Sequence, residues 1–355
     1  MPDRRVEVVV LIVCYNGRRH LDECLGSVLA DEEAGIRTRV VVVDNASADG
    51  SADYVAERFP RVELVRSRAN LGFAGGNNLG WEHIRRKWPD LDYLVLLNQD
   101  TLVEPGWLGP LAGFLAAHPD AACAQPKLMM HPQTDRFNTS GNRSHFLGFG
   151  FVGDCGEVDR GQLSGPREVA FTSGAAMMVR ADLLRGGRLF EGAFFMYLED
   201  AELCWRLGQS GHGSFVIPDS VVYHKYAYGG NLRHYYYLER NRWFLLGAYY
   251  KPATLALLAP AAAVMELGQL VFAIARGVGR QKWRSWAFFL TPAGLGLLLR
   301  RRRQARRRRA VSDRRFTRTF CGTIDFPPLS GPLVRLVANP VLGAYWAVAR
   351  RLIFW

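Results

Sequence analysis

Hydrophobic and polar positions in the first hundred residues follow the rhythm of alternating strands and helices. Residues 6–13 form a near-continuous β-branched run, which is typical of a parallel strand buried on both faces. Four apolar residues between positions 21 and 29 then recur at helical spacing. This alternation predicts an open, mostly parallel, Rossmann-like α/β sheet with helices on both faces. Further strands are expected at residues 40–43, 62–65 and 93–97, and helices at residues 52–59 and from a Gly-rich loop at 70–76 to about 87.

The second half of the chain is patterned differently. Residues 131–166 are rich in Gly, Ser, Asn and Asp and are expected to form an excursion, while residues 214–224 resemble a last core strand. Composition shifts after about residue 231, where apolar stretches at 253–275, 283–299 and 333–355 alternate with basic residues. We therefore expect a first domain over residues 1–230 and a helical region over residues 231–355.

Charge and cysteine usage narrow the classes of protein. The 355-residue chain is 49% hydrophobic and 22% charged, which argues against disorder. Its formal net charge is +12, but eight arginines at 300–303 and 306–309 supply most of it and leave only +4 elsewhere. Six scattered cysteines without a CxxC pair indicate buried thiols in a reducing compartment. The strong positive charge is therefore a property of one segment, and the rest of the chain is only mildly basic.

Polar side chains follow two of the expected strands. Asp44 and Asn45 come directly after the second strand, and Asn98 and Asp100 follow the strand at 93–97. Ligands bind at the carboxyl ends of strands in such sheets, so these residues should face one crevice. Carboxylate oxygens there suit Mg²⁺ or Mn²⁺, and a carboxylate can also accept a hydrogen bond from a nucleotide base. Ordinary strand-end turns are the alternative for both pairs.

A Gly-rich segment, NLGFAGGNN at residues 70–78, lies between these strand ends. Glycines let backbone N–H groups approach phosphates, and a following helix presents its positive end. The segment is not the G-x-G-x-x-G of a dinucleotide fold. A tight turn into a helix explains it equally well.

An acidic pair and a histidine complete the candidate chemistry. Glu199 and Asp200 lie inside the run FFMYLEDAELCWR at residues 194–206, and His224 follows the last strand. A carboxylate can remove a proton from an attacking hydroxyl group, although acids also favour the first turn of a helix. A lone His is commonly a surface or core residue, but a neutral imidazole also suits Mn²⁺.

In order and spacing, these motifs resemble the family 2 inverting glycosyltransferases of the GT-A fold, especially the bacterial rhamnosyltransferase-like and galactofuranosyltransferase-like members. The resemblance covers about residues 6–250. It implies that Asp100 and His224 hold a divalent metal, Mn²⁺ or Mg²⁺, and that Asp200 is the catalytic base with Glu199 orienting the acceptor. It also implies nucleotide-sugar contacts from Asp44, Asn45, Asn70, Gly72, Gly75, Asn98 and Gly174.

One residue departs from the family pattern, and one pair of residues that fits the pattern has no assigned role. Asn98 stands where the family's D-x-D motif begins with Asp, so one negative charge is missing. Arg240-Asn241 resembles a family pair that follows the catalytic domain, and the sequence assigns it no role.

The resemblance implies sugar transfer from a nucleotide-sugar donor to a lipid-linked or polysaccharide acceptor in cell-surface glycan synthesis. Deoxythymidine diphosphate rhamnose is the leading donor, and a uridine diphosphate sugar such as galactofuranose is the alternative. The apolar stretches and arginines favour the cytoplasmic face of the membrane, with helices lying in the interface, although one span at 253–275 stays open. A non-catalytic protein that binds nucleic acid or anionic lipid through residues 300–309, and an idle sugar-binding relative, are the competing hypotheses. Because the arginines adjoin apolar segments, we expect lipid and not nucleic acid.

Overall fold

The computed structural model describes residues 4–225, 232–325 and 331–355. The chain forms two compact units, each assembled from separate stretches. The predicted domain boundary between residues 230 and 231 lies outside the described residues. The first unit contains Met1–Asn142, Gly153–Phe195 and Gly213–Ala227, and the second contains Arg143–Val152, Met196–His212 and Tyr228–Trp355.

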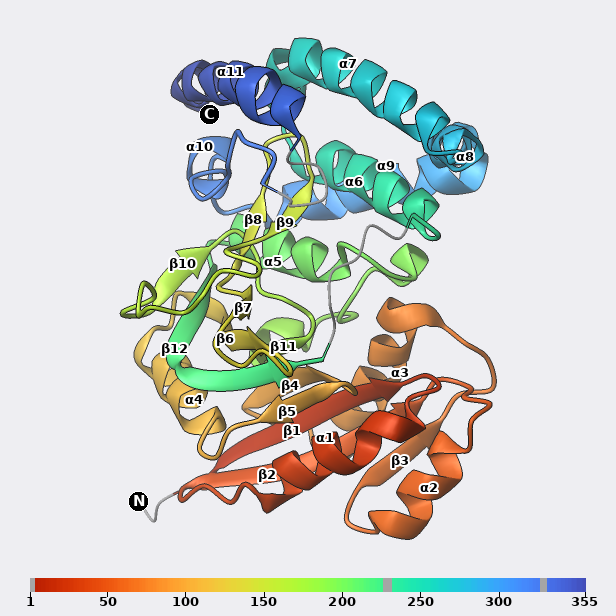
Figure 1. Ribbon diagram of the computed structural model, residues 1–355, viewed down its shortest axis with the longest axis vertical. Coiled ribbons are helices and arrows are strands. Elements are labelled where there is room, and N and C mark those ends of the chain that lie inside the picture. Colours follow the sequence, from red (N-terminus) through yellow and green to blue (C-terminus); the bar gives the residue numbers. More distant parts are fainter. Residues whose placement is uncertain (1–3, 226–231, 326–330) are drawn as a thin grey trace. The chain divides into compact units, whose positions relative to one another are not determined.

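A ten-stranded mixed sheet organises the first unit (Figure 1). Its main path runs β10-β12-β6-β11-β4-β1-β2-β3, with β5 beside β12 and β7 beside β6. The longest pairings, β1 with β2 and β12 with β6, are parallel, which confirms the predicted mostly parallel sheet, while β11 runs antiparallel between β4 and β6. The strands are β1 (Val6–Cys14), β2 (Ile36–Asp44), β3 (Glu63–Arg66), β4 (Tyr93–Asn98), β5 (Thr101–Val103), β6 (Ala121–Met130), β7 (Phe137–Thr139), β10 (Arg167–Val169), β11 (Ala176–Arg180) and β12 (Gly213–His224), and β8 (Asn142–Ser144) and β9 (Gly150–Val152) form a separate pair.

Helices cover both faces of the central strand β1, as its unbroken apolar run predicts. Val8, Val10 and Ile12 belong to one buried core cluster with the apolar face of α1. The alternate residue Leu11 meets α3, where a Cβ on Gly80 would lie 2.3 Å from it. The helices of this unit are α1 (Arg18–Ala30), α2 (Ser51–Arg58), α3 (Gly72–Lys87) and α4 (Leu108–Ala117), with 3₁₀ turns η1 (Asp182–Leu184) and η2 (Gly192–Phe194).

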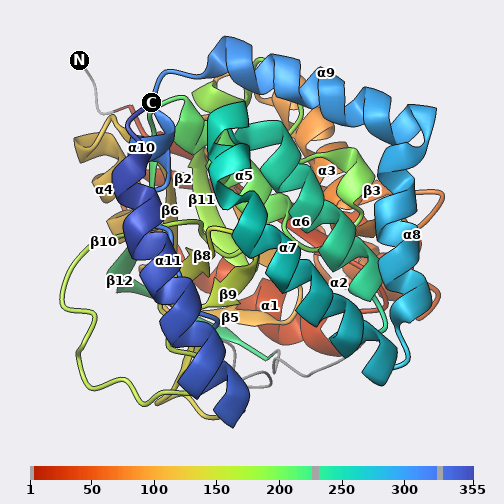
Figure 2. The ribbon, with the colours of Figure 1, turned by 90° about the horizontal axis from the view of Figure 1, so that it is seen from above.

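Helices make up most of the second unit (Figure 2). The apolar stretch predicted at residues 283–299 is broken between α8 and α9, because Pro292 starts a new helix and the Thr291 hydroxyl caps it by accepting from Gly294 N at 3.0 Å. The helices are α5 (Glu199–Gln209), α6 (Tyr235–Tyr249), α7 (Pro252–Ala275), α8 (Gly279–Leu290), α9 (Pro292–Arg308), α10 (Asp313–Phe316) and α11 (Asn339–Leu352), with a π-helical turn η4 (Val334–Ala338) before α11.

A buried ion cluster joins α6, α7 and α8 inside this unit. Arg242 pairs with Glu239 at 3.0 Å and with Glu266, while Lys282 pairs with Glu266 at 2.9 Å and with Glu239. Although burial alone would raise the pKa of Glu239, the charges of Arg242 and Lys282 lower it. The cluster is therefore a set of buried charges paired across these three helices.

Candidate active site

The carboxyl ends of β2, β4 and β12 point to the same edge of the sheet, and they carry the candidate residues of the first unit. Asp44 ends β2 and is buried. Its Oδ2 accepts a weak bond from Ser47 N at 3.4 Å, while its Oδ1 is buried without a hydrogen-bond partner among the described residues. A buried acceptor without a donor is costly, so Asp44 Oδ1 is a vacant acceptor suited to a ligand N–H.

Asn45 ties the end of β2 to the start of α3. Its Nδ2 donates to Asn70 Oδ1 at 3.2 Å and to Gly72 O at 3.1 Å, and its Oδ1 accepts from Leu71 N at 2.9 Å. Asn70 Oδ1 also accepts from Gly72 N at 2.8 Å. Because its side chain is buried and all its polar atoms are paired, Asn45 acts as a rigid bracket for the start of α3.

The predicted Gly-rich loop at residues 70–76 is mostly the first turns of α3. Gly72 has φ +70°, and a Cβ there would lie 2.4 Å from the carbonyl oxygen of Phe195. A Cβ on Gly76 would lie 2.7 Å from Val13 Cγ1, so this glycine lets the helix approach β1 closely. Gly75 is also helical. The expectation of a loop was wrong because these glycines serve close packing, yet the helix amino terminus that remains is still a suitable place for a phosphate.

Three side chains meet at the ends of β4 and β12. His224 Nε2 lies 3.4 Å from Asp100 Oδ1 and 3.4 Å from Asn98 Nδ2. Burial opposes ionisation of Asp100, but the hydrogen bond and charge of His224 lower its pKa below the usual value. Within residues 4–225, 232–325 and 331–355, no group of three or more His, Cys, Asp or Glu side chains could hold a metal. Asp100 and His224 therefore form a pair of candidate ligands, and other ligands would come from the donor or water.

Asn138 on β7 orients His224, which the sequence did not reveal. Its Oδ1 lies 3.2 Å from His224 Nδ1, and both side chains are buried. If Nδ1 carries the proton and donates it to Asn138, Nε2 keeps its lone pair toward Asp100. The two residues are 86 positions apart, so only the fold brings them together.

Gly174 lies in the turn before β11 and is buried. The next residue, Ala175, accepts a hydrogen bond from Asn98 N through its carbonyl oxygen at 2.8 Å. Gly174, expected to contact the nucleotide sugar, therefore lies beside the end of β4, next to Asn98.

The acidic pair belongs to the second unit, at the first turn of α5. Glu199 is buried, and its Oε2 has no hydrogen-bond partner among the described residues. Burial, followed by the charge of Asp200, raises the pKa of Glu199 well above its usual value. Asp200 is less buried, and its Oδ1 accepts from Ala201 N at 2.7 Å. Burial thus favours the neutral carboxylic acid at Glu199.

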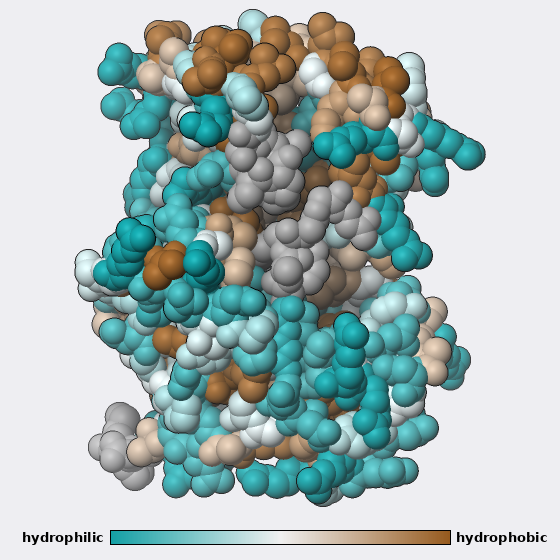
Figure 3. Space-filling view, viewed as in Figure 1, coloured by the Kyte–Doolittle hydropathy of each residue, from teal (hydrophilic) through white to brown (hydrophobic). Residues whose placement is uncertain are grey.

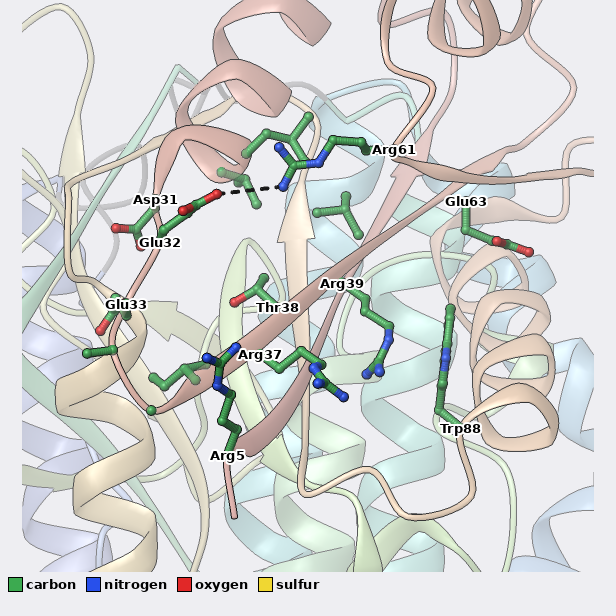
Figure 4. Close-up of a pocket in the computed structure, with 16 residues that line it drawn as sticks. Arg5, Asp31, Glu32, Glu33, Arg37, Thr38, Arg39, Arg61, Glu63 and Trp88 are labelled. Atoms are coloured by element: carbon green, nitrogen blue, oxygen red, sulfur yellow. Dashed lines mark ion pairs between the residues drawn. The ribbon is translucent and has the colours of Figure 1, made fainter. Parts of the chain in front are cut away.

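A cavity of about 600 Å³ lies at the opposite end of the first unit's sheet, by the amino ends of β1 and β2 (Figure 4). Charged side chains of both signs line it, and Arg61 and Glu32 across it are 3.8 Å apart. Glu33 in its wall caps α4 by accepting from Leu108 N at 2.8 Å and Gly109 N at 2.7 Å. This cavity is separate from the strand-end site.

The model of Glycosyl transferase family 2 matches residues 9–186, about half of the chain. The chain belongs to this family. The match spans the β1, Asp44, α3 and Asp100 region, and the resemblance stated from the motifs is confirmed.

Two bacterial relatives of this family-2 glycosyltransferase are named as rhamnosyltransferases. It is 26% identical over 237 residues to the N-acetylglucosaminyl-diphospho-decaprenol L-rhamnosyltransferase of Mycobacterium tuberculosis, covering 62% of this chain and 76% of that one. It is 21% identical over 249 residues to the rhamnosyltransferase WbbL of Escherichia coli, covering 67% and 89%. The chain is therefore similar to enzymes named for rhamnosyl transfer.

Solved structures establish the fold. GalNAc-T7 with UDP, GalNAc and Mn²⁺ has a TM-score of 0.56 at 15% identity, covering 70% of this chain and 49% of that one. S. aureus TarS 1–349 in complex with UDP has a TM-score of 0.53 at 15% identity, covering 98% and 90%. The predicted GT-A fold with a C-terminal helical region is confirmed.

Proposed function

We propose that this glycosyltransferase moves rhamnose from deoxythymidine diphosphate rhamnose to a lipid-linked or polysaccharide acceptor in cell-surface glycan synthesis. The main support for a nucleotide-diphosphate donor is Asp44 Oδ1, a buried acceptor without a hydrogen-bond partner among the described residues. It lies on the same edge of the sheet as Asp100 and His224. The names of the M. tuberculosis and E. coli relatives support rhamnose and, in the first case, a lipid-linked acceptor.

A uridine diphosphate sugar such as galactofuranose is the second candidate donor. UDP is the nucleotide bound in the GalNAc-T7 and TarS structures. Thymine and uracil both present a ring N–H, so Asp44 would accept from either base. The nucleotide therefore has to be distinguished by experiment and not by this contact.

A divalent metal fits the residues present. Asp100 offers a carboxylate oxygen, and His224 offers an imidazole nitrogen 3.4 Å from it. Such a ligand set suits Mn²⁺ better than Mg²⁺, since imidazole nitrogen is a softer donor than oxygen. When bound, the metal would supply positive charge that stabilises the departing diphosphate. Asn98 contributes a neutral amide beside it.

The proposed reaction is a single inverting displacement. Asp200 takes the proton of the acceptor hydroxyl as that oxygen bonds to the anomeric carbon. The bond from the anomeric carbon to the phosphate oxygen breaks, and its electron pair leaves with the nucleotide diphosphate. Glu199, held neutral by burial, can donate a hydrogen bond to an acceptor oxygen without competing for the proton.

The second unit has an exposed apolar surface that is suited to binding a membrane. Hydrophobic side chains gather over α7 and α11 (Figure 3). On α7 the exposed apolar residues recur at helical spacing on one face, and further ones lie before and on α11. The two helices are in contact, since Tyr345 Oη donates to Leu257 O at 2.5 Å. We define this surface, the apolar face, as Val264, Leu267, Val271, Ile274, Leu333, Leu336, Val337, Val341, Val348, Leu352 and Phe354.

Charge around the apolar face points to anionic lipid. Residues 252–355 contain eighteen basic and three acidic residues, a net +15, which leaves −3 for the rest of the +12 chain. Two arginines of the basic run are used internally, because Arg302 donates to Gly247 O and Arg309 pairs with Asp313. Five others, Arg300, Arg303 and residues 306–308, are exposed and can contact head groups.

Interfacial binding explains α7 better than a span does. Among the described residues, α7 is the one helix long and apolar enough to cross a membrane. Its Glu266, however, is held by Arg242 and Lys282 of the buried ion cluster. A spanning α7 would have to take these charged partners with it into the lipid, which is costly. An interfacial helix keeps the cluster intact and exposes its apolar row to the acyl chains.

Vesicle flotation tests the membrane surface. The wild-type chain should float with phosphatidylglycerol-containing vesicles and bind phosphatidylcholine vesicles weakly. Leu267→Glu with Val271→Glu should abolish flotation, whereas removing surface charge from the first unit by Arg58→Gln with Arg61→Gln should not. Equal flotation of the apolar-face variant, or resistance of the wild type to carbonate extraction, would contradict interfacial binding; the second result would favour a span.

A donor panel tests the proposed reaction. Nucleotide diphosphate release is measured from deoxythymidine, uridine and guanosine diphosphate sugars, with Mn²⁺, with Mg²⁺ and with chelator, and the product anomer is assigned by NMR. We expect metal-dependent release from deoxythymidine diphosphate rhamnose with inversion. Release from a uridine diphosphate sugar alone would show that deoxythymidine diphosphate rhamnose is not the donor. Retention of configuration at the anomeric carbon would contradict the single displacement.

A further inference from the structure

The two residues directly ahead of the acidic pair have an unusual backbone. Tyr197 has φ +67° and Leu198 has φ +63° and ψ 9°, although neither is glycine. Side chains with a Cβ adopt this left-handed region at a cost, so surrounding contacts must hold the segment there. Leu198 O accepts the first helical bond of α5, from Glu202 N at 2.8 Å. The path of this segment therefore sets where Asp200 begins the helix.

Asn241 on α6 supplies that hold. Its Nδ2 donates to Met196 O at 3.0 Å and to Tyr197 O at 2.8 Å, so both amide hydrogens are used on consecutive carbonyls. Asn241 is fully buried. One buried side chain thereby donates to two consecutive backbone carbonyls directly before the acidic pair.

Arg240 fixes the orientation of the Asn241 amide. Its Nε and Nη2 donate to Asn241 Oδ1 at 3.1 and 2.9 Å, which leaves only the Nδ2 side free to face the carbonyls. The guanidinium group lies 5.0–5.3 Å from the ring centres of Tyr236, Tyr237 and Phe288. Arg240 is itself nearly buried, so this orientation is built into the packing.

The body of α5 is anchored without Asn241. Trp205 Nε1 donates to Ser144 Oγ at 2.9 Å, and Gln209 Nε2 donates to Tyr249 O at 2.5 Å. Loss of the Asn241 bonds would therefore leave the helix packed while its first turn, with Asp200, loses its fixed approach.

We propose that Asn241, oriented by Arg240, is a positioning residue that holds the segment before Asp200 in its left-handed conformation and thereby places the catalytic base. The inference rests on the proposed role of Asp200. It also gives a role to the Arg240-Asn241 pair, for which the sequence suggested none.

Asn241→Asp tests this with little change in shape, because it sets a carboxylate oxygen against two carbonyls that need donors. The matched control is Gln209→Glu, which replaces another buried amide that donates to a carbonyl in the same unit. With the preferred donor, kcat per folded molecule should fall about 100-fold in Asn241→Asp, as for a catalytic group misplaced by about 1 Å. Affinity for the nucleotide diphosphate should change less than about twofold, because this affinity is proposed to reside in the first unit.

The outcomes separate a positioning role from a structural one. Gln209→Glu should lower the melting temperature but keep kcat per folded molecule. A wild-type kcat in Asn241→Asp, or a loss that only follows the folded fraction as in the control, would overturn the proposal. If Asn241→Asp does not fold, Arg240→Met, which removes the two bonds that orient the amide and keeps an unbranched side chain against the rings, is judged by the same criterion.

Asp200→Asn distinguishes this proposal from the proposed function. If Asp200→Asn abolishes turnover while Asn241→Asp does not, only the positioning role fails. If Asp200→Asn retains turnover, the assignment of the base fails, and the role of Asn241 fails with it.

Discussion

Replacing Asn45 by Ala should cost both stability and donor affinity. The change removes three hydrogen bonds and leaves Leu71 N and Gly72 O without this partner, while Asn70 Oδ1 keeps only Gly72 N. At about 1 kcal/mol of net stability for each bond, the free energy of unfolding should fall by about 3 kcal/mol. For a domain of this size that is a drop of about 6–12 °C in melting temperature.

Urea unfolding and titration with nucleotide diphosphate measure the two effects of Asn45→Ala. Affinity should fall because the start of α3 loses its bracket to β2. Asn45→Asp is the matched contrast, because it keeps the acceptor for Leu71 N but sets a buried carboxylate oxygen against Asn70 Oδ1 and Gly72 O, so it should cost at least as much as Asn45→Ala. If Asn45→Ala unfolds within about 0.5 kcal/mol of the wild type and binds nucleotide equally well, the bracket has no energetic role.

Three further changes probe other parts of the chain. Burial lowers the pKa of His145 to about 3; its neutral ring therefore adds stability that is complete above about pH 6.5 and is lost as the pH falls toward 3, by up to about 1.4 kcal/mol per pH unit. His145→Phe should flatten this acid sensitivity in urea unfolding between pH 7 and 5, and an unchanged slope would refute it. Glu239→Gln leaves the buried cluster with two cations and one acid; it should cost about 3–5 kcal/mol in urea unfolding, and a loss below about 1 kcal/mol would show that the cluster is dispensable. Gly76→Ala drives a Cβ to 2.7 Å from Val13 Cγ1 and should cost about 1–3 kcal/mol by thermal melting, whereas Gly113→Ala, a helical site with nothing within 4 Å, should be neutral or stabilising.

The strands of the sheet could be predicted well because each is a short, continuous run of apolar, mostly β-branched residues. The β-branched run at residues 6–13 became the central strand β1, and the run ending at Asp44 became β2. The start of α3 was mistaken for a loop, since glycine within a helix usually signals a break. Gly76 instead allows α3 to approach Val13 closely. Val13 is distant in the sequence, so this contact could be found only from the structure.

Some residues of the candidate site could likewise be predicted from the sequence, and others could not. Asp44 and Asp100 could be proposed because polar residues directly after buried strands lie at a known edge of the sheet. Asn138 could not, because its relation to His224 depends on β7 pairing beside β6. The role of Asn241 was also hidden, since its two bonds reach back more than 40 residues to backbone atoms that carry no sequence signal. Local pattern thus identified the chemical groups, and tertiary contacts identified what holds them.

Turnover of Asp200→Asn, compared with its nucleotide affinity, tests the central claim most directly. The variant keeps the size of the side chain and removes the base. Using the donor that the wild type turns over, we expect kcat to fall by about 10²–10⁴-fold, with metal-dependent nucleotide diphosphate binding unchanged. Turnover close to that of the wild type would contradict a catalytic base at Asp200, and loss of nucleotide binding together with turnover would contradict its separation from the donor site.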